Sequence, residues 1–106
     1  MRAYVTNYGE PMPIVGVRVT NNNPRYPIRI NAVAFTPASQ SEPPDLWFDG
    51  SDIELPRPIG PRDGDTIDIP VERISEVEDP LRPAFVGWIE LKTGVILSSQ
   101  PHQREP

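Results

Sequence analysis

Apolar side chains alternate with polar ones in several short runs along the chain, which is the pattern of strands that bury one face. In 14–21 valine occupies every second position, and in 65–71 isoleucine and valine do the same. Pro70 lies near the end of the second run. Because proline lacks the amide hydrogen that a strand ladder needs, this run is expected at a sheet edge or a strand end.

Further strands are predicted over 2–7, 28–36, 46–48, 53–55, 84–91 and 95–99. The apolar phase slips within 28–36, since its isoleucines have one parity and Val33 and Phe35 have the other. A one-residue slip would turn side chains to the wrong face. We therefore expect a bulge near Asn31 and Ala32 that absorbs it.

The segments between these strands are rich in turn formers, with 15 prolines and 7 glycines in the chain. The last two strands are predicted to form a hairpin through Lys92-Thr93-Gly94, in which glycine supplies a positive φ. Residues 56–64 are expected to be a stiff, extended linker. At most one short helical turn is predicted, near 72–79, and 101–106 are expected to be a flexible C-terminal tail because no apolar residue anchors them.

Seven to eight short strands with turn signals between them predict an all-β fold, either a sandwich or a small barrel. The 106 residues are the usual size of one domain, which we place at 1–100. The chain therefore forms one domain with a thin core and little room for a deep cleft.

The order of three motifs resembles that of small bacterial and phage immunoglobulin-like or fibronectin-like domains. The motifs are a strand that ends at Asn21 before the Pro27-Ile28 strand, Leu55-Pro56 followed by the turn at 61–65, and Thr93-Gly94 in the last hairpin. The resemblance covers residues 14–99 and implies an immunoglobulin-like antiparallel β-sandwich. It also implies an interaction or structural role, without the cysteine pair of immunoglobulins.

The net charge of −5 argues against a sequence-independent nucleic-acid binder, which needs cations to displace phosphate counterions. The chain has no cysteine, no apolar run near 18 residues and no apolar run of signal-peptide length at its start. We therefore expect a cytoplasmic or virion protein that binds neither nucleic acid nor membrane.

Catalytic motifs are missing from the sequence. The single histidine, His102, lies near the end of the chain, and no glycine-rich phosphate loop occurs. We therefore expect neither enzymatic activity nor a cofactor. The acidic turns contain weak calcium candidates, but aspartate and glycine are also ordinary turn formers, so no metal site is predicted. These candidates are Asp49, Asp52, Asp63 and Asp65.

Aromatic residues give the candidate binding surface. In 84–91, Val86 and Trp88 have the parity opposite to the apolar face, so Trp88 is either covered by a loop or exposed to a partner. Trp47 has the same two interpretations. Tyr26 and Arg25 complete the set of binding-surface candidates.

These features predict a non-catalytic structural or protein-interaction module, for example an accessory, decoration-type protein of a phage particle. Such a module would bind a protein partner, self-associate as a homo-oligomer or assemble on a larger particle. One alternative is an acidic regulator that binds a basic partner surface. Another is a carbohydrate-binding domain that uses exposed aromatic rings, with Trp47, Trp88, Tyr26 and Tyr8 as candidates.

Overall fold

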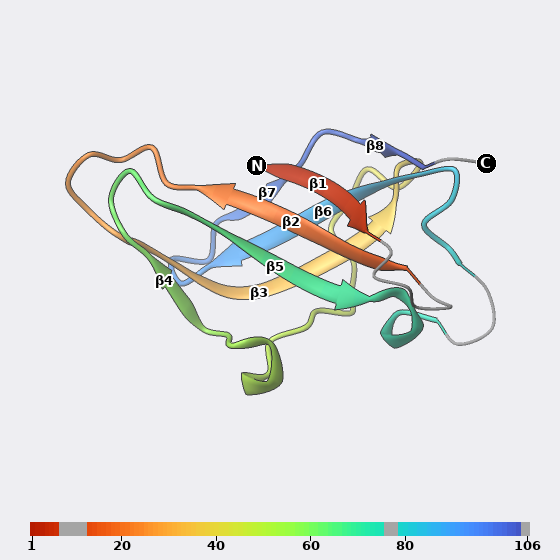
Figure 1. The fold of residues 1–106 in the computed structure, drawn as a ribbon, viewed down its shortest axis with the longest axis horizontal. Helices are drawn as coiled ribbons and strands as arrows, with labels where there is room; N and C mark the ends of the chain where they lie inside the picture. The colour runs from red at the N-terminus through yellow and green to blue at the C-terminus, as the bar shows by residue number, and fades with distance from the viewer. Residues whose placement is uncertain (7–12, 76–78, 105–106) are drawn as a thin grey trace.

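The computed structural model describes residues 1–6, 13–75 and 79–104, which form two antiparallel sheets packed face to face (Figure 1). The first sheet has three strands in the order β1 (Arg2–Thr6), β2 (Ile14–Thr20) and β5 (Gly64–Pro70). The main path of the second sheet runs β4 (Arg57–Ile59), β3 (Ile28–Pro37), β6 (Ala84–Leu91) and β7 (Ile96–Ser98). β8 (His102–Gln103) also pairs with β6.

This architecture confirms the predicted all-β sandwich. The chain crosses between the two sheets after β2, after β4 and after β5. Strands 1, 2 and 5 therefore face strands 3, 4, 6 and 7, which is the arrangement of an immunoglobulin-like sandwich. Pro70 ends β5 at the edge of the first sheet, as its missing amide hydrogen predicts.

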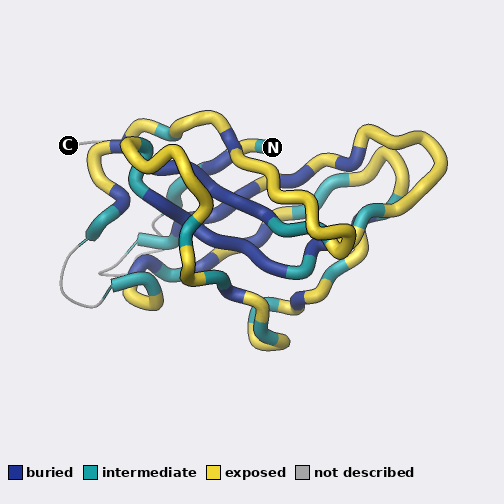
Figure 2. The backbone as a smooth tube through the Cα atoms, turned by 180° about the vertical axis from the view of Figure 1, so that it is seen from behind, coloured by how far each residue is buried: buried dark blue, intermediate teal, exposed yellow. Residues whose placement is uncertain are grey.

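Period-two alternation builds the core. The valines of β2 and the isoleucines of β5 are buried against the inward residues of β3 and β6, and the buried stretches lie in the middle of the strands (Figure 2). The register between β3 and β6 shifts between Ile30 and Ala32. The predicted bulge is confirmed, and it lets residues of both parities in β3 reach the core.

Asn21 joins two of the crossings at one end of the sandwich. Its buried side-chain amide donates to the carbonyls of Tyr26, at 2.9 Å, and Gly60, at 3.1 Å, and its backbone N–H donates to Asp63. The connection after β2 is thereby tied to the connection after β4. This gives a physical reason for asparagine at the end of β2.

Four local predictions between residues 46 and 79 are wrong or incomplete. Residues 51–53 form a 3-10 turn in place of the strand predicted at 53–55, and β4 lies inside the predicted linker. Within 46–48, only Phe48 pairs, through an isolated bridge to Val33. The helical turn expected near 72–79 is a 3-10 turn over Val71–Arg73, and 76–78 lie outside the described residues.

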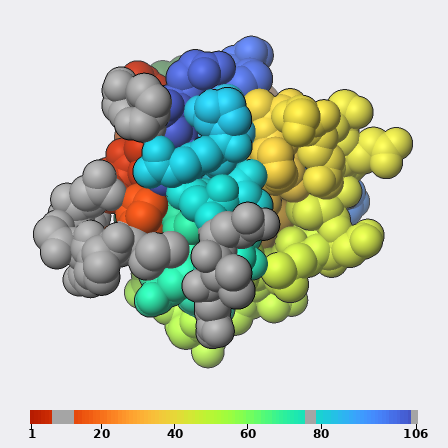
Figure 3. Space-filling model, turned by 90° about the vertical axis from the view of Figure 1, so that its right-hand side faces the viewer, coloured from red at the N-terminus to blue at the C-terminus, as the bar shows by residue number. Residues whose placement is uncertain are grey.

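The C-terminal residues differ from the expected flexible tail. β8 pairs with the start of β6, and the Arg104 guanidinium forms a buried ion pair with Asp79. Figure 3 shows the C-terminal segment against residues 79–84 at this end of the molecule. An ion pair holds this segment. The lack of apolar residues in 101–106 therefore did not predict that the segment is docked. Residues 105–106 lie outside the described part of the chain.

Within the described residues, no helix is long and apolar enough to cross a membrane.

Candidate protein-interaction edge

An open sheet exposes unpaired backbone groups at its edge strands, and proteins usually protect these edges with charge, proline or short length. In the described residues, three edge strands carry such protection. β1 begins with exposed Arg2, β4 has three residues with Pro58 at its centre, and β5 carries Asp68 and ends in proline. The guanidinium of Arg57 also donates to the β5 carbonyl of Thr66 at 2.8 Å.

β7 is as short as β4, with three residues, but it carries neither charge nor proline. All of its residues are exposed, and the apolar side chains of Val95, Ile96 and Leu97 keep 48%, 40% and 45% of their surface accessible. Residues 93–101 contain no charged residue, and their only proline is Pro101. β7 is thus an apolar, uncharged edge strand.

The position of β7 in the sandwich explains its exposure. Leu97 is opposite Ile89 of β6, so both side chains lie on the inward face of the second sheet. Ile89 is completely buried, whereas Leu97 is nearly half exposed. The second sheet therefore extends past the cover that the first sheet provides, and its inward face emerges at β7.

The hydrogen-bond ladder decides which backbone groups of β7 are free. The Leu91 N–H donates to the Val95 carbonyl at 2.9 Å, and the Ser99 N–H donates to the Gly87 carbonyl at 2.8 Å. Backbone groups in an antiparallel ladder alternate in direction, so residues 95, 97 and 99 turn theirs toward β6. Ile96 and Ser98 therefore turn their N–H and C=O groups toward the free edge.

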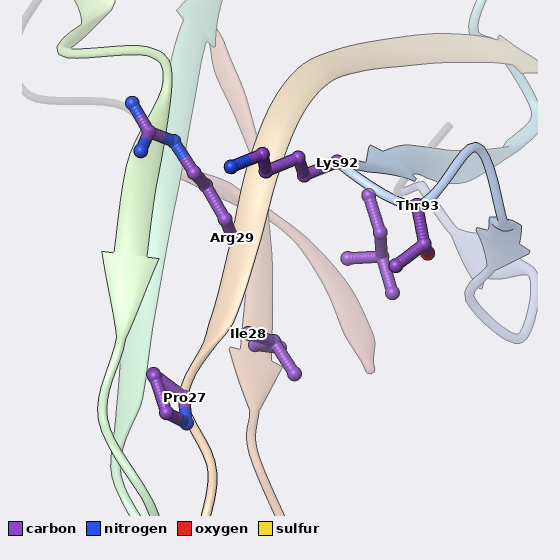
Figure 4. Close-up of a pocket in the computed structure, with 6 residues that line it drawn as sticks. Pro27, Ile28, Arg29, Lys92 and Thr93 are labelled. Atoms are coloured by element: carbon purple, nitrogen blue, oxygen red, sulfur yellow. The ribbon is translucent and has the colours of Figure 1, made fainter.

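A small hollow lies where the start of β3 meets the end of β6, and none of residues 95–99 lines it. It has a volume of about 190 Å³ and is lined by Pro27, Ile28, Arg29, Leu91, Lys92 and Thr93. Arg29 and Lys92 extend at one end of it (Figure 4), and the Lys92 N–H donates to the Arg29 carbonyl. Pockets for drug-sized ligands have about 300–1,000 Å³, so this hollow suits a protein side chain better than a small molecule.

The predicted aromatic surface is largely covered. Trp88 is 7% exposed and packs with Val86 and Ala34 in a second apolar cluster, against which Trp47 and Ala38 lie. The Trp88 indole N–H donates to the Thr36 hydroxyl at 2.7 Å. Loop residues thus cover Trp88, so neither Trp88 nor Val86 offers an exposed contact, and Trp47 is only half-buried.

The other two candidates lie in the connection between β2 and β3. Tyr26 is 66% exposed and Arg25 is also exposed. Asn23 fixes this connection, because its side-chain oxygen accepts the N–H groups of both residues. The structure therefore separates the five predicted residues into a covered cluster on one sheet and an exposed loop at one end. Tyr8 lies outside the described residues.

The weak calcium candidates are used in turns and ion pairs. Asp52 pairs with Arg73 at 2.7 Å and Asp65 with Arg57 at 3.1 Å, while Asp63 accepts the N–H of the next residue. Asp49 is exposed. Over 1–6, 13–75 and 79–104 no three acidic, histidine or cysteine side chains are grouped closely enough to hold a metal. A polar hollow of about 450 Å³ lies between Asp52 and Asp68, with Arg57 in its lining.

The chain was compared with protein families, curated proteins and solved structures. None of them matches it. Membership of an immunoglobulin-like domain family therefore stays a prediction. The fold and the geometry of its edges carry the functional argument.

Sequence reasoning identified 95–99 as a strand but did not identify it as a binding surface. The available signal was three successive apolar residues, Val95, Ile96 and Leu97, without alternation. Neighbouring side chains of a strand point to opposite faces, so three in a row cannot all enter one core. Which of them stays exposed depends on how far the opposite sheet extends.

Proposed function

We propose that this chain is a non-catalytic protein-interaction module that binds an extended strand of a partner along β7. The observation that carries the proposal is the uncharged edge, where Ile96 and Ser98 present backbone groups and Val95 to Leu97 present apolar surface. A partner strand would gain ladder hydrogen bonds from the backbone and selectivity from the alternate side chains.

The two alternatives have less support. Carbohydrate binding needs exposed, coplanar aromatic rings, and of the described candidates only Tyr26 is mostly exposed. A regulator that binds a basic surface needs available acids on one face. The acids Asp52, Asp65 and Asp79 each contact an arginine of the same chain.

An accessory position on an assembled particle is one form of the proposed role. It requires a partner with an accessible strand on the particle surface. Co-purification of the chain with the particle, lost when β7 is altered, is the measurement for this form.

The general proposal is tested with a displayed library of extended peptides, selected against the intact protein at low micromolar concentration. Selected peptides should slow hydrogen exchange at the Ile96 and Ser98 amides, since these are the donors that face outward. Leu97→Lys should remove binding, because it places a charge on the contact face. The matched control, Thr66→Lys on β5, should retain it. Peptides that protect other amides, or that bind the Leu97→Lys variant equally well, would contradict the proposal.

A further inference from the structure

We propose that β7 binds a second copy of this chain, in an antiparallel pair whose two-fold axis passes Leu97. This inference rests on the proposed function, because it names the partner of the same edge. It joins the second sheets of two molecules into one continuous sheet. The pair is symmetric, as most homodimer interfaces are.

The direction of the free backbone groups selects this register. When Leu97 faces Leu97 of the other copy, Ile96 of each chain stands opposite Ser98 of the other. All four outward groups of each edge are then used, because Ile96 and Ser98 exchange both of their hydrogen bonds. A shift that places Ile96 opposite Ile96 leaves Ser98 opposite Gly94. The Gly94 N–H already donates to the Leu91 carbonyl at 2.8 Å.

The side chains match in the same register. Leu97 meets its own copy at a non-hydrogen-bonded position, where side chains are closest, and Val95 lies opposite Ser99 on the same face. The exposed Leu97 side chains of the two copies therefore pack beside each other on the inward face of the joined sheet. Both contacts remove apolar surface from water.

Charge also permits this pair although each chain carries a net charge of −5. Residues 93–101 are uncharged, so no like charges meet at the contact. The nearest acid on the neighbouring strand is Glu90, opposite Ile96. The two copies of Glu90 are separated by three strand spacings, about 14 Å. That distance exceeds the Debye length of about 8 Å at physiological salt.

The contact is small, so the dimer should be weak. An edge pair formed by short strands buries less than the roughly 1,200 Å² typical of stable complexes. We therefore expect a dissociation constant on the order of 100 micromolar. Sedimentation of the intact protein from 10 micromolar to 1 millimolar covers the expected transition.

Cysteine substitution tests the register directly, because the chain has no cysteine of its own. Leu97→Cys should form a disulfide-linked dimer under mild oxidation, since Cα atoms of such a pair are about 4.5 Å apart and disulfides need about 4.4–6.8 Å. Ile96→Cys is the matched control. Its Cα atoms would be offset by two residues and lie more than about 7 Å apart, which is too far. Equal cross-linking of the two variants would overturn the register.

Sedimentation of Leu97→Lys tests the surface, because two lysines would then meet at the axis. Dimerisation should weaken about tenfold or more. Thr66→Lys, on an exposed position of β5, should change it by less than about twofold. Circular dichroism checks that both variants keep the fold. A dimer that Leu97→Lys leaves unchanged would overturn the proposal.

A wild-type protein that stays monomeric at 1 millimolar would also overturn the second-copy proposal. If selected peptides still protect Ile96 and Ser98, the proposed function stands with a different partner. If neither peptides nor a second copy contact β7, both proposals fail.

Discussion

Gly87 sets the closest approach of the two sheets, and its replacement by alanine gives a quantitative test of the packing. It lies on the inward face of β6. A Cβ atom at this position would lie 2.1 Å from Cγ1 of Val17 and 3.5 Å from the ring of Phe35. The first distance is far below the 3.5–4.0 Å of a normal carbon contact.

The two sheets therefore have to move apart by about 1.5 Å at this point, or the Val17 side chain has to leave its rotamer. Overpacking of this kind costs about 1–3 kcal/mol. Alanine offsets part of this, because it suits a strand better than glycine by about 0.5–1 kcal/mol. We expect Gly87→Ala to lower the free energy of unfolding by about 1–2 kcal/mol net.

Val17→Ala provides the matching change in the opposite sheet. Val17 is completely buried, so removal of its two methyl groups should cost about 2–3 kcal/mol, including the cavity that remains. In the double variant the alanine Cβ at 87 occupies part of that cavity. The two changes should then be coupled by about 1 kcal/mol or more, so that the double variant is more stable than the sum predicts.

The assay is equilibrium urea unfolding of the four proteins, with fluorescence and circular dichroism as probes and equal m-values as the condition for comparison. Additive effects within about 0.5 kcal/mol would refute the reasoning. A neutral Gly87→Ala would do the same, because it would mean that this contact does not fix the distance between the sheets.

Two further predictions concern connections that hold the sandwich together. Asn21→Ala should lower the free energy of unfolding by about 2–3 kcal/mol, because it leaves the buried Ile59 carbonyl and the partly buried Tyr26 and Gly60 carbonyls without this donor. An unchanged urea midpoint would contradict the role of Asn21 in joining the two crossings. Arg104→Ala should cost about 2–3 kcal/mol, because it leaves the mostly buried Asp79 carboxylate without its closest partner. Arg82→Ala removes a more exposed partner of the same acid and should lower the free energy of unfolding by less than about 1 kcal/mol in the same titration. Equal losses of stability for the two arginine variants would argue against β8 as a docked strand.

Local features of the fold could be read from the sequence. Alternation is a property of a single strand, so 14–21 and 65–71 showed which side chains face inward. The change of parity in 28–36 located the bulge, and Gly94, with φ of 89°, supplied the predicted positive φ of the last hairpin. Each of these signals depends on residues within one or two positions of each other.

Longer-range features needed the tertiary structure. β4 contains Pro58 and no alternation, and it is a strand because β3 offers it a partner. The end of the chain is held by Arg104 and Asp79, which are 25 positions apart in sequence. Neither pairing has a local sequence signal.

The sequence by itself determined that the chain forms short strands with one apolar face, because side-chain direction follows from neighbouring residues. Only the tertiary structure decided that a loop covers Trp88 while Leu97 stays exposed. Both residues lie in apolar strands of the same hairpin, and the difference comes from what lies opposite each of them. Exposure depends on where distant segments of the chain end, and alternation within a strand contains no information about that.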